Sequence, residues 1–215
     1  MNRIKSLIVL LLLCVFQFSM AQMQDGWSLQ KDASGIKVYT KEAGDSGYKP
    51  FKATVLLDNT VEEFASVMYD VDGLLDWGYK IKTAWLFERS GDSLQIYYAE
   101  AKAPFPYKNR DGIYKNVFQW NSKTKTLLVK INLLENYKVV DPDLVAIKGH
   151  GYWSATQLNS GKLEVTFMME VNPGGEIPAW MANMVVDDSP YYTLLNLREA
   201  INKPKYKNKK YSFIK

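Results

Sequence analysis

Two charged residues lie on segments that alternation predicts to be neighbouring strands. Alternation along residues 94–100 puts Glu100 on a face that is otherwise apolar, and alternation along residues 110–120 puts Arg110 on a face with aromatic residues. The residues that share these faces are Leu94, Ile96, Tyr98, Tyr114, Phe118 and Trp120. We therefore expect Glu100 and Arg110 to point inward and to pair. The alternative is a surface salt bridge worth about 0 to 1 kcal/mol.

Four methionines fall on the last two regular segments, Met168 and Met169 on an alternating one and Met181 and Met184 on a helical one. Methionine is flexible and polarizable, so it adapts to irregular apolar partners. For any single methionine, filling a core is the simpler interpretation. Methionines on two elements that face one cavity would favour contact with a ligand.

Residue sets for covalent or metal chemistry are sparse. His150 is the only histidine, and no zinc-ligand set accompanies it. The pattern Ser-x-x-Lys occurs at several serines, among them Ser28, Ser34 and Ser122, and none of these three opens a predicted helix. The sequence Asp70-Val71-Asp72-Gly73 lacks the spacing of a calcium loop and indicates a turn that ends a helix. We expect no catalytic residue, no metal and no cofactor.

The N-terminus has the three parts of a secretory signal peptide. Arg3 and Lys5 precede an apolar run from Leu7 to Phe16, and Ser19-Met20-Ala21 supplies small residues before a cleavage site. The run is shorter than the roughly 20 residues of a membrane-spanning helix, which is the alternative. We expect cleavage after Ala21, a mature domain over residues 22–215, and a periplasmic or secreted protein.

The charge balance gives no reason to expect nucleic-acid binding. Without Arg3 and Lys5, the basic residues outnumber the 23 acidic ones by only two. A local cluster of lysines follows the last predicted helix, at positions 203, 205, 207, 209 and 210. It has two interpretations, namely a transient contact with an anionic membrane surface or a solvated, frayed terminus.

The elements that must position these residues follow from periodicity. A short helical or extended segment from Trp27, a Ser34-Gly35 turn and a strand to Tyr39 are predicted first. A second strand over Phe51–Leu57 and a capped helix from Val61 to about Tyr69 follow. Residues 83–171 predict an antiparallel meander that ends in a clear strand at 162–171. A helix from about Ile177 to Ile201 follows, which Pro190 should kink or divide. This order predicts a monomeric α+β domain in which a curved sheet surrounds a C-terminal helix.

Four blocks of the chain resemble the START family of lipid-transfer domains, over a range from Trp27 to about Ile201. They are Gly35-Ile36-Lys37-Val38-Tyr39, the helix ending in Asp76-Trp77, the stretch Ala103-Pro104-Phe105-Pro106-Tyr107-Lys108-Asn109-Arg110-Asp111, and the stretch Pro173-Gly174-Gly175-Glu176-Ile177-Pro178-Ala179-Trp180 running to Asn196-Leu197-Arg198. The resemblance implies a helix-grip fold that holds one lipid or sterol-like molecule in an internal cavity gated by the C-terminal helix. It also implies an internal ion pair of the arginine near the polar end of the ligand.

The candidate ligand-binding set is assembled from these patterns and from the resemblance. It comprises Arg110, Glu100, Tyr114, Phe118, Met169, Met181 and Met184. Binding and transfer of a lipid without covalent chemistry is the main functional prediction. The alternatives are a cavity enzyme of the same superfamily, cyclase- or hydrolase-like, and a periplasmic ligand sensor.

Overall fold

The computed structural model describes residues 26–215, and the predicted signal peptide at residues 1–21 lies outside them. Ten strands occur within the described residues. They are β1 (Trp27–Ala33), β2 (Ile36–Lys41), β3 (Phe51–Leu57), β4 (Ile81–Ser90), β5 (Leu94–Ala101), β6 (Arg110–Asn121), β7 (Thr126–Leu133), β8 (Val145–Ala146), β9 (Lys148–Gln157) and β10 (Leu163–Asn172). The helices are α2 (Val61–Tyr69), α3 (Leu74–Trp77), α4 (Ala179–Met184), α5 (Asp188–Ala200) and the 3-10 helix η1 (Pro204–Tyr206).

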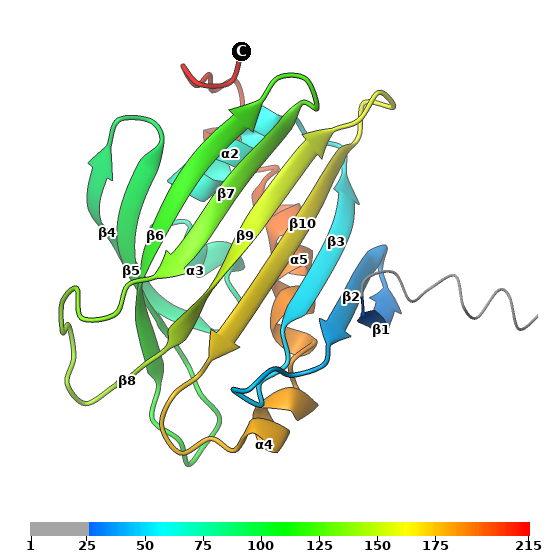
Figure 1. Ribbon diagram of the computed structural model, residues 1–215. Helices are drawn as coiled ribbons and strands as arrows, with labels where there is room; N and C mark the ends of the chain where they lie inside the picture. Colours follow the sequence, from blue (N-terminus) through cyan, green and yellow to red (C-terminus); the bar gives the residue numbers. More distant parts are fainter. Residues whose placement is uncertain (1–25) are drawn as a thin grey trace, which may run out of the picture.

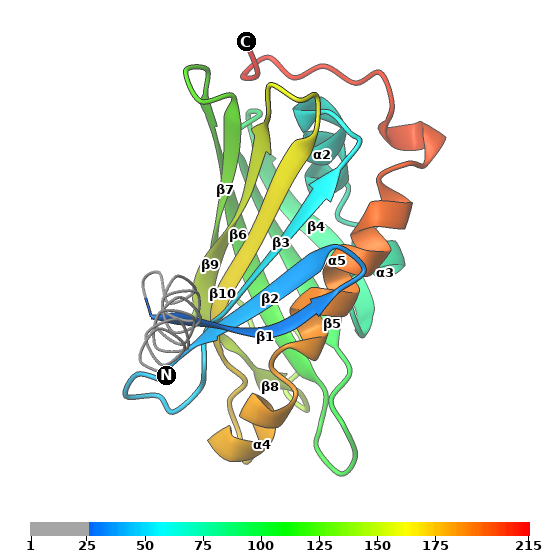
Figure 2. The same ribbon diagram turned by 90° about the vertical axis from the view of Figure 1, so that its right-hand side faces the viewer.

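All of these strands form one sheet in the order β1-β2-β3-β10-β9-β7-β6-β5-β4, with β8 added in parallel to the start of β6. Strand β10 pairs with both β3 and β9, so it joins the N-terminal strands to the meander (Figure 1). Figure 2 shows the sheet curving with the helices on one side of it. The structure therefore has the α+β helix-grip fold that the sequence predicts.

Neighbouring strands run in opposite directions, which brings particular strand ends together. The starts of β3, β4 and β6 and the ends of β5 and β10 meet at the end of the sheet where α4 lies. We call this the α4 end. Helix α2 and the C-terminus lie at the opposite end in both views (Figures 1 and 2).

Helix α2 begins where the capping pattern predicts. The Thr60 hydroxyl accepts a hydrogen bond from the Glu63 amide at 3.3 Å, and the Glu63 carboxylate accepts one from the Thr60 amide at 3.3 Å. This reciprocal pair satisfies two amides that a helix start would leave without partners. The helix ends at Asp70, whose carboxylate accepts from the Gly73 amide at 3.0 Å, so the expected turn is confirmed.

The C-terminal helix is two helices. The sequence predicts a segment from about Ile177 to Ile201 that Pro190 kinks or divides, and the structure divides it into α4 and α5. Pro190 lies in the first turn of α5, where a missing amide hydrogen removes no helical hydrogen bond. Among residues 26–215, no helix is long and apolar enough to cross a membrane.

Both faces of the sheet are buried near β5 and β6. The main core fills the concave face and includes Phe64, Trp153 and Leu197. A second, smaller core on the outer face contains Ile96, Tyr98 and Ile113, with the partly buried Leu134 and Val140 packed against it. Residues of the β7–β8 connection thus cover this part of the convex face, and β5 is apolar on both sides.

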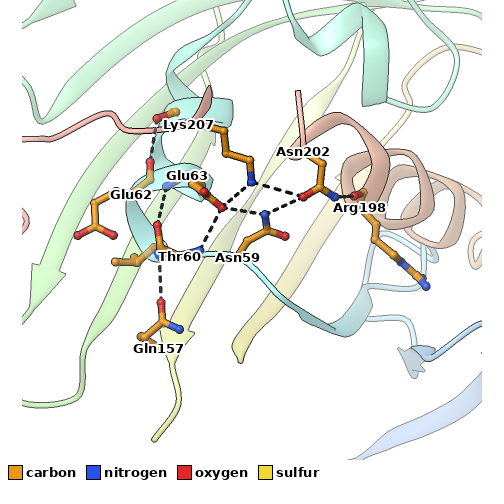
Figure 3. Close-up of polar contacts among 10 residues, drawn as sticks. Asn59, Thr60, Glu62, Glu63, Gln157, Arg198, Asn202 and Lys207 are labelled. Atoms are coloured by element: carbon orange, nitrogen blue, oxygen red, sulfur yellow. Dashed lines mark hydrogen bonds and ion pairs between the residues drawn. The ribbon is translucent and has the colours of Figure 1, made fainter. Parts of the chain in front are cut away.

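The segment after α5 is fixed to the domain. Tyr206 is 2% exposed, and its hydroxyl donates to the Asp70 carboxylate at 2.8 Å. Three of the five tail lysines form ion pairs, Lys203 with Asp76 at 2.7 Å, Lys205 with Asp70 at 2.7 Å and Lys207 with Glu63 at 3.0 Å. Figure 3 shows Lys207 and Asn59 converging on Glu63. The expectation of a frayed terminus is therefore wrong for residues 203–207, because acids of α2, α3 and the turn between them hold it.

Candidate functional site

A cavity of about 610 Å³ lies between the concave face of the sheet and helices α3, α4 and α5. Residues of β3, β5, β6, β9 and β10 line one wall, and residues of the three helices line the other. Ligand sites commonly measure about 300–1,000 Å³. The cavity is therefore large enough to hold one small amphipathic molecule.

Aromatic rings form the middle of the cavity wall. Trp153 and Phe167 are paired across β9 and β10, and their rings stack at 3.9 Å with an angle of 4°. Trp77 meets Trp153 edge-on at 5.8 Å, and Phe51 meets Phe167 edge-on at 5.1 Å. Large rings held in this way give a firm apolar surface with little rotamer freedom.

Arg110 lines the cavity at the α4 end and is only 7% exposed. Its Nε donates to the Pro173 carbonyl and its Nη2 to the Gly174 carbonyl, both at 3.2 Å, and its Nη1 donates to the Lys108 carbonyl. Burial lowers the pKa of Arg110 from its ordinary value, since a buried charge loses hydration. The guanidinium thus ties the β10–α4 connection to the start of β6.

The β10–α4 connection turns sharply against β8. Gly174 and Gly175 both have φ of +64°, a conformation that side chains disfavour. A Cβ at Gly174 would also lie 2.8 Å from the Ala146 carbonyl oxygen. Two glycines are therefore required for the chain to pass β8 and begin α4 over the cavity.

Glu100 does not meet Arg110, so the expected ion pair is wrong. The β5–β6 register places Glu100 opposite Asp111, and Arg110 opposite Ala101. Directly paired residues share a face, so Glu100 lies on the convex side and Arg110 on the concave side. Glu100 accepts hydrogen bonds from Lys82 at 2.9 Å and from Asn109 at 2.8 Å instead. Alternation along β5 gave the wrong face for Glu100 because this strand is apolar on both faces.

Of the other predicted ligand residues, Tyr114, Met169 and Met181 line the cavity, whereas Phe118 and Met184 do not. Phe118 is on the expected face, but it lies eight residues along β6 from Arg110, about 26 Å at the rise of a strand. There the Phe118 ring packs on the Tyr69 ring, with 4.5 Å between the ring centroids. Met184 ends α4 and is 71% exposed, because the predicted continuous helix breaks after it.

The sequence reasoning missed most of the aromatic lining. It singled out none of Phe51, Trp77, Tyr97, Trp153 and Phe167 as ligand residues, although Phe167 alternates with Met169 on the same strand face. Tyr97 and Tyr114 stack at 5.1 Å, and burial raises the pKa of both phenols well above the ordinary value. Both hydroxyls therefore stay protonated at physiological pH.

The lining offers little for acid–base catalysis. Asp188 is the one carboxylate among the described lining residues, and it accepts a hydrogen bond from Lys31 at 3.1 Å. Within residues 26–215 no group of three His, Cys, Asp or Glu side chains is arranged to hold a metal ion. The chemistry that this wall supports is apolar contact along its length and positive charge at one end.

A curved antiparallel sheet that encloses an apolar cavity with its C-terminal helices defines the helix-grip class of ligand-binding proteins. A family model described as START domain matches residues 10–204, and the chain belongs to this family.

Comparison with known proteins adds three relatives. An uncharacterized protein of Pseudomonas aeruginosa is 28% identical over 88% of this chain and 93% of its own length. The rat phosphatidylcholine transfer protein is 29% identical over 73% of this chain and 75% of its own. The crystal structure of a STAR-related lipid transfer protein fragment from Xanthomonas axonopodis superposes with a TM-score of 0.78 at 30% identity, covering 83% of this chain and all of that one.

Proposed function

We propose that this protein binds one lipid in the cavity and carries it between membranes. The observation that carries the proposal is the cavity of about 610 Å³ with its aromatic wall. Apolar surface of this extent is costly to leave in water, so an apolar guest gains free energy by covering it. The names of the rat and Xanthomonas relatives agree with this function.

The α4 end is the proposed membrane-docking surface. Phe105 on the β5–β6 connection is 97% exposed, and Trp180 and Met184 on α4 are 63% and 71% exposed. Lys102 and Lys108 flank Phe105 and are exposed as well. Aromatic side chains favour the headgroup region, and lysines there attract anionic lipids at about 1 kcal/mol each. This surface replaces the C-terminal lysines as the proposed contact, since three of those are ion-paired at the other end of the molecule.

We propose that α4 and its connection move when the lipid is released through this end. Pro104 and Met181 line the cavity from the two sides of the α4 end. The Arg110 hydrogen bonds to the Pro173 and Gly174 carbonyls hold that connection closed. Displacing α4 would open the cavity toward a membrane docked beside Phe105 and Trp180.

The proposal further includes binding without covalent change, as a monomer, in the periplasm or outside the cell. The described lining supplies no pair of carboxylates for general acid and base work, and its residues all come from one chain. The expected signal peptide at residues 1–21 supports export. N-terminal sequencing of the protein recovered from a periplasmic extract tests the export step, and a chain that retains Met1 would contradict it.

The binding step is tested on protein purified without detergent. Denaturing mass spectrometry should detect a lipid at about one per protein chain, chemically identical to a lipid of the host membrane. Protein that carries no lipid and extracts none from vesicles would contradict the function. A bound lipid that is altered during incubation would favour an enzyme instead.

The transfer step is tested with donor and acceptor vesicles that contain anionic lipid. The double variant Phe105→Ser/Trp180→Ser should transfer lipid at least fivefold more slowly than the wild type. Leu56→Ser is the matched control, because Leu56 is 56% exposed and lies on β3 away from the cavity lining. Equal rates for the double variant and the control would contradict docking at the α4 end.

A further inference from the structure

Among residues 26–215, the buried guanidinium of Arg110 has no anionic partner. Each of its hydrogen bonds goes to a main-chain carbonyl. The residue opposite it on β5 is Ala101, and the next residue on that face of β5 is Ala99. Three of its five N–H groups are used, which leaves one on each terminal nitrogen for another acceptor. A buried charge without a counter-charge is costly, so this position favours an anion.

Three lysines line the same end of the cavity as Arg110. Lys49 precedes β3, Lys80 precedes β4 and Lys102 follows β5, and these strand ends meet at the α4 end. None of the three forms an ion pair with another described residue.

The two carboxylates nearby share one lysine, so together they offset only one of the four positive charges. Asp188, the one carboxylate of the described lining, lies 3.1 Å from the Lys31 ammonium, and the neighbouring Asp187 lies 3.0 Å from it. The α4 end of the cavity therefore carries net positive charge, and its potential attracts an anionic group.

The cavity of about 610 Å³ has room for an apolar group of the size of an acyl chain.

We propose that the ligand is an amphiphile with an anionic head group, bound with its head at Arg110 and its apolar part along Trp153 and Phe167. This inference rests on the proposed lipid-binding function and names the class of lipid. A carboxylate and a phosphate monoester both supply acceptors for the two remaining N–H groups. The binding assay separates these two chemistries.

The test compares three ligands of one chain length on delipidated protein, with tryptophan fluorescence as the readout of binding. Hexadecanoate and hexadecyl phosphate should bind at least tenfold more tightly than hexadecanol. A preference for one anion over the other identifies the head group. Hexadecanol that binds as tightly as both anions would overturn the inference while leaving lipid binding intact. Failure of all three ligands to bind would instead contradict the proposed function.

Variants of Ala101, which lies opposite Arg110 in the hairpin, test whether the Arg110 charge selects the ligand. Ala101→Glu supplies a carboxylate beside Arg110 and should abolish the preference for the anions over hexadecanol. Ala101→Gln adds the same bulk without charge and should retain it. An equal preference in both variants would show that the Arg110 charge does not select the ligand.

The lysines are tested in the same assay. The double variant Lys80→Gln/Lys102→Gln should lower the preference for the anions severalfold. Lys130→Gln is the control, because it removes an exposed lysine of β7 that lies outside the cavity lining. It should leave the preference for the anions unchanged. An unchanged preference in the double variant would contradict a contribution from these lysines.

Discussion

Glu100 and Arg110 belong to one hairpin, yet they point to opposite faces of the sheet. Glu100 lies opposite Asp111, and Arg110 lies opposite Ala101. The carboxylate is held by Lys82 and Asn109 on the outer side, and the guanidinium is held by carbonyls of the β10–α4 connection on the inner side. The two charges therefore have separate roles, and substitutions can separate them.

Glu100→Gln should leave ligand affinity unchanged. The side chain is outside the cavity lining, and glutamine keeps an oxygen that can accept from Asn109. The lost charge pair with Lys82, whose side chain is 52% exposed, should lower the free energy of unfolding by at most about 1 kcal/mol. Titration with lipid and urea denaturation check the two expectations. A tenfold loss of affinity would show that Glu100 communicates with the cavity.

Arg110→Lys should loosen the β10–α4 connection while keeping a positive charge in the cavity. Lysine lacks the planar fork that lets Arg110 reach Pro173 and Gly174 together. We expect ligand to dissociate several times faster and stability to fall by about 1 to 3 kcal/mol. Stopped-flow displacement measures the rate. An unchanged rate in a destabilised variant would assign Arg110 to folding alone.

Asp70→Asn tests the attachment of the C-terminal segment. Burial alone would raise the pKa of Asp70, but hydrogen bonds from Lys205 and Tyr206 outweigh it and lower the pKa below the ordinary value of 3.8. A lowered native pKa adds stability above pH 3.8 that is lost as pH falls through the native pKa. The variant should be less stable than the wild type at pH 7 by about 1 to 3 kcal/mol. The difference should shrink below pH 3.8. Urea denaturation at pH 7 and pH 3 checks this, and an equal difference at both would contradict it.

Deletion of residues 208–215 should lower the melting temperature without affecting ligand binding. Tyr211 and Phe213 pack on Tyr69 at ring distances of 4.9 and 6.2 Å, and the Trp120 indole donates to the Lys215 carbonyl at 2.8 Å. These contacts lie at the end of the sheet opposite α4 (Figure 2). Scanning calorimetry and lipid titration of the truncated chain provide the test. A parallel loss of affinity would place this segment in the binding function.

Local patterns predicted the elements whose signals are short-range. The strand Phe51–Leu57, the cap at Thr60 and the alternation along β10 were all confirmed. Each depends on residues within one turn or one strand, and the tertiary structure does not override them. The four blocks that resemble the START family predicted the fold, because they correspond to a strand, a helix, a corner and a helix start.

The site was predicted less completely because its geometry depends on what covers each face. Alternation along β5 could not show which of its two apolar faces borders the cavity. Glu100 shares a face with Tyr98, and that face packs in the outer core and not in the cavity. Alternation along β6 gave the face of Phe118 correctly, but it could not show that α2 covers that end of the strand. Met184 was misplaced because the helix ends directly after it and not near Pro190, where the sequence predicted a kink or a division.

The carbonyl partners of Arg110 have a consequence for the response to acid. A closure made by a carboxylate opens when that acid takes up a proton, whereas the Pro173 and Gly174 carbonyls do not titrate. Closure should therefore persist in an acidified compartment. Any discharge of cargo on acidification would then arise from protonation of the cargo itself, whose neutral head group no longer balances the guanidinium.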